Sequence, residues 1–161
     1  MPYEVTLGQP QPINYGFEGD SSVDFDLGID PEAGEGARMT VALVEDTDSG
    51  NDPFTLLFGV RLTSLETDET KVFIFDHATA RRYAPEDVAG EILVLVLESL
   101  QMLVEAVNPT TIIMGTYETA LPPSAMVKYE RISKLLELLG YTETSYYRDA
   151  TDLRDHWLFT K

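Results

Sequence analysis

The stretch TKVFIFDHATARRYAPEDVAGEILVLVLESLQMLVEAVNPTTIIMG, residues 70–115, sets a long apolar helix between two apolar strands. The pattern predicts a strand over 70–76, a helix from about Pro85 to Val107 and a buried strand over 110–115. Pro85 suits the first helical position, because its missing N–H is not needed there. The strand–helix–strand order predicts a right-handed crossover that leaves the two strands parallel and adjacent.

The helix in this stretch has only a narrow polar stripe. Its polar positions, about seven residues apart, are Glu91, Glu98 and Glu105, together with Gln101. Most of the remaining helix surface is apolar, so we expect the helix to be buried on more than one side.

Working outward, MTVALVE (39–45) and FTLLFGVRLT (54–63) predict two more strands that form an antiparallel meander with 70–76. A second helix is predicted over 124–139, with Gly140 as its C-terminal stop. YTETSYYR and DHWLFT then predict a terminal hairpin. The fold class is α/β (α+β): a mixed, mostly antiparallel sheet with one β-α-β crossover and two main helices, in the order β-β-β-α-β-α-β-β from residue 39.

The second helix and the hairpin carry further expectations. Apolar residues at helical spacing mark the core face of the helix: Met126, Tyr129, Ile132, Leu136 and Leu139. Basic residues mark its outer face: Lys128, Arg131 and Lys134. A terminal hairpin exposes a sheet edge, which makes a homodimer through that edge possible.

A chain of 161 residues suits a single domain. Residues 1–38 form an irregular, acidic segment in which YEVTL, INYGF and VDFDLGI alternate like short strands, and residues 39–161 form the core. The chain has no cysteine and two histidines, so no zinc site is expected. The start lacks a signal pattern and no apolar run is long enough to span a bilayer, so we expect a cytoplasmic protein.

Charge is the strongest compositional feature. Lys and Arg number 11 against 28 Asp and Glu, for a net charge of −17. Residues 1–52 hold 12 of the acids and a single base, Arg38. Such a surface repels nucleic acid and anionic membranes and attracts basic proteins. The residues expected to bind a basic protein partner are Asp20, Asp24, Asp26, Asp30, Glu32, Glu35, Asp46, Asp48 and Asp52. The alternative is that this acidity serves solubility or a salt-rich habitat.

The element order from residue 39 and the loop RRYAPEDVAG (81–90) resemble the GNAT family of N-acetyltransferases. In that family the loop reads Gln/Arg-x-x-Gly-x-Gly/Ala, and its amides and the helix N-terminus hold the pyrophosphate of acetyl-CoA. Arg82 matches the first position. Pro85 has no N–H to donate, and Asp87 places a carboxylate where a phosphate would lie. The resemblance therefore implies the fold without a recognisable acetyl-CoA motif; Arg81 and Arg82 are weak candidates for an anion.

The ends of strands 70–76 and 110–115 hold a second candidate site. Asp76, His77, Tyr117 and Glu118 follow these strands, and ligands commonly bind at such ends in open α/β sheets. Asp76 orienting His77 as a general base, with Tyr117 as an acid, is the catalytic interpretation. The simpler interpretation makes His77 an ordinary histidine at a strand end.

The leading hypothesis is an acidic, non-enzymatic interaction protein on a GNAT-like scaffold. It would act as an inhibitor, an adaptor or a nucleic-acid mimic, as in phage or mobile-element accessory proteins. One alternative is a divergent acyl-CoA-dependent N-acyltransferase that retains Arg82 and the amides of residues 88–90. Another is an enzyme of a different class that uses Asp76, His77 and Tyr117. No cofactor is expected, with acetyl-CoA as the exception that the second hypothesis requires.

Overall fold

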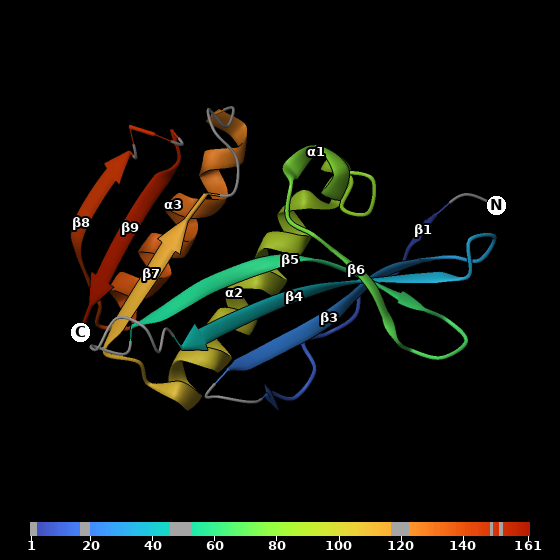
Figure 1. The fold of residues 1–161 in the computed structure, drawn as a ribbon, viewed down its shortest axis with the longest axis horizontal. Helices are drawn as coiled ribbons and strands as arrows, with labels where there is room; N and C mark the ends of the chain where they lie inside the picture. Colours follow the sequence, from blue (N-terminus) through green and yellow to red (C-terminus); the bar gives the residue numbers. More distant parts are fainter. Residues whose placement is uncertain (1–2, 17–19, 46–52, 117–122, 149, 152) are drawn as a thin grey trace.

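A mixed sheet runs through the computed structural model, which describes residues 3–16, 20–45, 53–116, 123–148, 150–151 and 153–161 (Figure 1). The strands among these residues are β1 (Glu4–Val5), β2 (Asn14–Tyr15), β3 (Ser21–Asp30), β4 (Glu35–Glu45), β5 (Phe54–Ser64), β6 (Thr70–Ile74), β7 (Thr111–Gly115), β8 (Thr142–Arg148) and β9 (Asp155–Thr160). Their order is β1-β3-β4-β5-β7-β9-β8, while β2 pairs with β3 and β6 with β5. The mostly antiparallel α+β fold is thus confirmed.

One detail of the sequence prediction is wrong. Strands 70–76 and 110–115 do not pair with each other; β7 instead pairs in parallel with the first residues of β5, with Phe54 opposite Ile112. The five-residue β6 covers only the second half of β5, from Val60 to Thr63. The first half of β5 is therefore not paired with β6, and β7 pairs with Phe54–Leu56 on this edge instead.

Three helices accompany the sheet in the described residues: α1 (His77–Ala80), α2 (Ala89–Val107) and α3 (Pro123–Leu138). A 3-10 turn over Glu86–Val88 leads into α2. The left-handed Asn108 (φ 49°) ends α2, and Gly140 (φ 99°) follows α3 as its predicted stop. The polar stripe of α2 lies in solvent as expected, and its buried residues form the opposite face: Ile92, Leu95, Val96, Ser99, Leu100, Leu103 and Val104.

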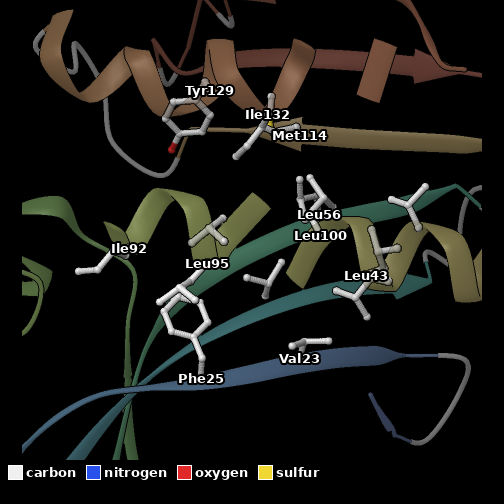
Figure 2. Close-up of a cluster of buried hydrophobic side chains, with 14 of the residues drawn as sticks. Val23, Phe25, Leu43, Leu56, Ile92, Leu95, Leu100, Met114, Tyr129 and Ile132 are labelled. Carbon is white, nitrogen blue, oxygen red and sulfur yellow. The ribbon is translucent and has the colours of Figure 1, made fainter. Parts of the chain in front are cut away.

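Both long helices pack on the same face of the sheet (Figure 1). Cross-strand register places Val41, Leu56, Met114 and Trp157 on that face, and all four are buried. Figure 2 shows side chains from β3, β4 and β5 meeting side chains from α2 and α3 in one cluster. Residues directly opposite in a ladder share a face, so this single register fixes the whole core.

The described part of residues 1–38 supplies three whole strands to this sheet and the first four residues of β4, which begins at Glu35. Gly28, beside a bulge in β3, allows β1 to lie close against it. A Cβ at Gly28 would lie 2.2 Å from the Glu4 carbonyl oxygen and 2.6 Å from the Tyr3 hydroxyl. The Tyr3 hydroxyl donates to the Tyr83 carbonyl at 2.9 Å, which ties the N-terminal segment to the loop before α2.

Among the described residues, no helix is long and apolar enough to cross a membrane.

Candidate functional site: a cleft between the two long helices

The break between β6 and β7 positions a cleft. Strand β6 ends at Ile74, opposite Val60, and β7 ends at Gly115, next to the Met114–Leu56 pair. Both strands lie along the same edge of β5, because β4 occupies the other edge over its full length. In the described part of the chain, residues 57–59 of β5 therefore have no strand partner on this edge.

The cleft opens above this gap, between the N-terminal turns of α2 and α3. Its main part has a volume of 330 Å³. A smaller extension of 70 Å³ reaches the uncovered edge of β5 and the ends of β6 and β7. Most of the lining is apolar and several wall residues are small: Met39, Phe58, Ala80, Ala84, Ala89, Gly90, Ile92, Leu93, Val96, Ala125 and Val127. A mostly apolar concavity with a few polar groups is the usual form of a small-molecule site.

Two cations lie at the cleft. The Lys128 ammonium sits 4.6 Å from the centre of the Phe58 ring and 5.2 Å from that of Tyr129. Arg81 is linked to Glu86, with Nη1 and Oε2 3.4 Å apart. Its Nη2 lies 3.1 Å from Nε2 of His77, which must accept because a guanidinium only donates. Three positively charged or basic side chains thus converge on an apolar hollow.

The structure separates the two candidate arginines. Arg81 lines the cleft, whereas Arg82 lies 3.8 Å from the Asp30 carboxylate and 5.4 Å from the Tyr83 ring centre. Arg82 is the residue that matches the GNAT motif. It forms an ion pair with Asp30 of β3 and is not part of the cleft wall.

The loop before α2 contains Pro85 and Asp87, the two residues that depart from the acetyl-CoA motif. Pro85 precedes the 3-10 turn, and its carbonyl accepts from the Val88 amide at 3.2 Å. Neither Pro85 before this turn nor Val88 before α2 makes a side-chain capping hydrogen bond. Gly90 has no atom within 4 Å of where its Cβ would be, so the wall of the cleft is open at this point. An incoming group would meet small residues here.

The corner predicted from Asp76, His77, Tyr117 and Glu118 is only partly described. Asp76 caps α1, accepting from the Thr79 amide at 2.8 Å. Hydrogen bonds with the Thr79 side chain and then its amide lower the pKa of Asp76. His77 lies in the cleft wall. Tyr117 and Glu118 lie outside the described residues.

Several predicted docking residues are paired within the chain. Asp24 binds Arg61 and accepts from the Thr40 hydroxyl at 2.6 Å. Further contacts are Asp26 with Arg38 at 3.0 Å, Glu35 with Lys71 at 3.4 Å, Asp20 with the Glu45 amide at 3.2 Å, and Asp30 with the Ala33 amide at 3.0 Å. Glu32 is exposed, while Asp46, Asp48 and Asp52 lie outside the described residues. Arg38, Arg61 and Lys71 therefore offset much of the local charge of the strands.

Lys128 and Phe58 were not among the predicted site residues. The helical pattern assigns Lys128 to an outer basic face, but the side chain is half-buried over Phe58. Only Arg131 and Lys134 are exposed as predicted. The position of Lys128 in the sequence could have identified it as a site residue. It lies in the first turns of a helix that follows a parallel strand, where open α/β sheets bind ligands.

His156, in β9, lies on the opposite face from Trp157 and Phe159, as alternation predicts. The His156 side chain is half-buried, and its ring stacks on Tyr147 with centroids 4.9 Å apart. Among the described residues, no three or more His, Asp or Glu side chains gather in a way that could hold a metal ion.

No protein-family model, no curated protein and no solved structure matches the chain.

Proposed function

We propose that the chain binds an amphipathic anion, with the apolar part of the ligand in the cleft and its charged group near Lys128 and Arg81. The observation that supports this most directly is the 330 Å³ hollow at the break between β6 and β7, lined by apolar side chains with cations at its wall. Burial of apolar ligand surface supplies affinity at roughly 25 cal/mol per Å². The cations supply the preference for negative charge.

The charge of the cleft contrasts with that of the whole chain. Among the described residues, the cleft wall holds Arg81, Lys128 and the carboxylate of Glu86, in a protein of net charge −17. An anion is repelled by the protein at long range, but at physiological salt the charges beyond about 8 Å are largely screened. The local pair of cations then decides which ligands enter.

Acyl thioesters of coenzyme A are amphipathic anions of this kind. The proposed ligand class is therefore consistent with the hypothesis of a divergent N-acyltransferase. The apolar cleft would accept the acyl and thioester portion, and Arg81 and Lys128 would attract phosphates. Pro85 and Asp87 argue against the pyrophosphate position of the GNAT family, so any such ligand would have to place its phosphates differently. His77 would then be the nearest candidate base. The separate enzyme hypothesis needs Tyr117 as well.

A second candidate function is the acidic interaction protein. The net charge of −17 favours it, because such a surface attracts basic proteins. The ion pairs of Asp24, Asp26 and Glu35 reduce the charge that β3 and β4 offer, so the candidate depends on the remaining acids. Association with a basic protein should weaken as salt rises, and a flat salt dependence would contradict it.

Thermal unfolding with three probes tests the ligand proposal: decanoyl-CoA, free coenzyme A and decanoate. A ligand that binds only the native state raises the melting temperature, by an amount that grows with its concentration. We expect a rise that grows with the concentration of decanoyl-CoA or decanoate, and a smaller rise with coenzyme A alone. No rise with any probe at millimolar concentration would contradict the proposal for this ligand class.

The Gly90 position provides a blocking variant and its control. Gly90→Leu places a side chain in open space at the cleft wall, and Gly90→Ala adds only a methyl group there. We expect Gly90→Leu to abolish the rise in melting temperature and Gly90→Ala to keep it. An unchanged response in Gly90→Leu would place the ligand elsewhere.

A further inference from the structure

The two ends of the sheet differ in how they present their edges. At one end β1 and β2 are two residues long, which leaves little backbone for another strand to pair with. At the other end β8 is seven residues long and every one of them is exposed. Its inner edge pairs with β9, and among the described residues no strand pairs with its outer edge. A long exposed edge is a template for a further strand.

The exposed side chains of β8 can contact a strand that pairs with its outer edge. Tyr146 and Tyr147 are 52% and 54% exposed and point to opposite faces, since they pair with Trp157 and His156. A register shift between Glu143 and Ser145 places Glu143 on the same face as Tyr146 and Arg148. One face of the strand thus carries an acid near one end and a base at the other.

Two of these side chains are already ordered. The Tyr146 hydroxyl donates to the Asp155 carboxylate at 2.9 Å, and Arg148 Nε donates to the same group at 3.0 Å. The Asp155 side chain is buried. Because Tyr146 and Arg148 are held before any partner arrives, less side-chain entropy is lost on association.

The distribution of charge indicates which partner fits. Residues 1–52 hold 12 acids and one base, whereas residues 141–161 hold four acids and three bases. The hairpin is therefore a part of this acidic chain that another acidic chain can approach with little local repulsion. Glu143 and Arg148 on one face make the strand self-complementary when it meets its own copy in the antiparallel direction.

We propose that two copies of the chain associate through β8, antiparallel and edge to edge about a two-fold axis, and extend the sheet across both. Backbone hydrogen bonds form between the two β8 strands, centred near residues 145–147. Arg148 of each copy then lies toward the partner's Glu143, and the exposed tyrosines pack across the junction on both faces. The interface is isologous, as closed dimers require.

The salt dependence of this association is distinctive. Two copies of net charge −17 repel each other at long range, and salt shortens that repulsion from a Debye length of about 14 Å at 0.05 M to about 4 Å at 0.5 M. The dimer should therefore tighten as salt rises. A complex with a basic protein should do the opposite, so the two kinds of association are distinguishable.

Sedimentation equilibrium of the full chain at low and high salt is the test. We expect the dimer dissociation constant to fall several-fold at high salt. Ser145→Lys places a charge in the exposed edge and should weaken the dimer at least tenfold, while Gln101→Lys on the exposed face of α2 makes the same change of charge and should not. A monomer at every concentration and salt would overturn the proposal.

Cross-linking provides a second readout, which reports the geometry of the interface. The chain has no cysteine, so Ser145→Cys and Tyr147→Cys each create a single thiol. A disulfide needs Cβ atoms about 3.5–4.5 Å apart, which only residues near the two-fold axis satisfy. We expect one of the two variants to form a disulfide-linked dimer under mild oxidation far faster than Gln101→Cys. Equal rates in all three would overturn the proposal.

Discussion

The ammonium of Lys128 lies 4.6 Å from the centre of the Phe58 ring, which places a cation from the first turns of α3 over the floor of the cleft. The contact joins the two parts of the proposed site, because Phe58 belongs to the stretch of β5 that β6 and β7 leave uncovered. Its aromatic face holds the aliphatic and charged parts of the lysine in the cleft wall.

Lys128→Met keeps the apolar stem of the side chain and removes its charge. If the cleft binds an amphipathic anion, this change should weaken binding of decanoate or decanoyl-CoA by about fivefold or more, as expected for the loss of a charge-assisted contact of roughly 1 kcal/mol. Arg131→Met, on the exposed face of the same helix, alters the net charge equally and serves as the control. Equal losses in both variants, measured by calorimetry, would reduce the effect to general electrostatics.

Two leucines on α3 test the packing of this helix. Leu136 is fully buried, while Leu138 is 85% exposed. Leu136→Ala should lower the free energy of unfolding by about 2–5 kcal/mol, because it removes buried methyl groups and leaves a cavity. Leu138→Ala should change it by less than about 0.5 kcal/mol. Chemical denaturation of both variants gives the comparison, and similar values would mean that α3 does not pack as described.

We expect alanine substitutions at Gly28 and Gly90 to change the free energy of unfolding in opposite directions. Gly28→Ala would force a methyl group against the Glu4 carbonyl and the Tyr3 hydroxyl, so β1 must move away. We expect a loss of about 1–3 kcal/mol, as for other overpacked sites, and faster proteolysis of the first residues. Gly90→Ala meets no atom within 4 Å and should stabilise α2 by up to about 1 kcal/mol. A neutral Gly28→Ala would contradict the close approach of β1.

Asp155 gives a pH-dependent prediction. Hydrogen bonds from Arg148 and Tyr146 hold the pKa of Asp155 below its ordinary value, despite the opposing effect of burial. A carboxyl whose folded pKa is depressed contributes stability that is complete above its unfolded pKa, about 3.9, and is lost as pH falls through the folded value. The stability advantage of the wild-type chain over Asp155→Asn should be about 1–3 kcal/mol at neutral pH and should shrink below about pH 4. Glu98→Gln, which changes an exposed acid on α2, should show no such advantage.

Much of this fold is predictable because its elements follow local patterns. The predicted strands at 39–45 and 54–63 correspond to Glu35–Glu45 and Phe54–Ser64, and the predicted helix at 124–139 corresponds to Pro123–Leu138. In each case alternation or helical spacing of apolar residues marks one buried face. Gly140 also ends its helix in the left-handed conformation that the sequence indicates.

The partner of β7 was not predictable in the same way. Apolar residues in 110–115 indicate a buried strand without indicating which edge covers it. The outcome depends on the length of β6, which ends at Ile74 shortly before Asp76 caps α1. A five-residue strand beside an eleven-residue strand leaves half an edge free, and the cleft is a consequence of that difference in length. Helical periodicity predicts that Lys128 points away from the core face of α3. It does not predict that Phe58 of a neighbouring strand packs against that side of the helix.

The central claim is that an amphipathic anion occupies the cleft over the uncovered edge of β5. The most direct measurement is a titration of ¹⁵N-labelled protein with decanoate and with decanoyl-CoA, following the backbone amide resonances. We expect saturable shifts concentrated at Phe58, Gly59, Gly90 and Ala125, and their loss in Gly90→Leu. Shifts that do not saturate, or that cluster on the strands away from α2 and α3, would contradict it.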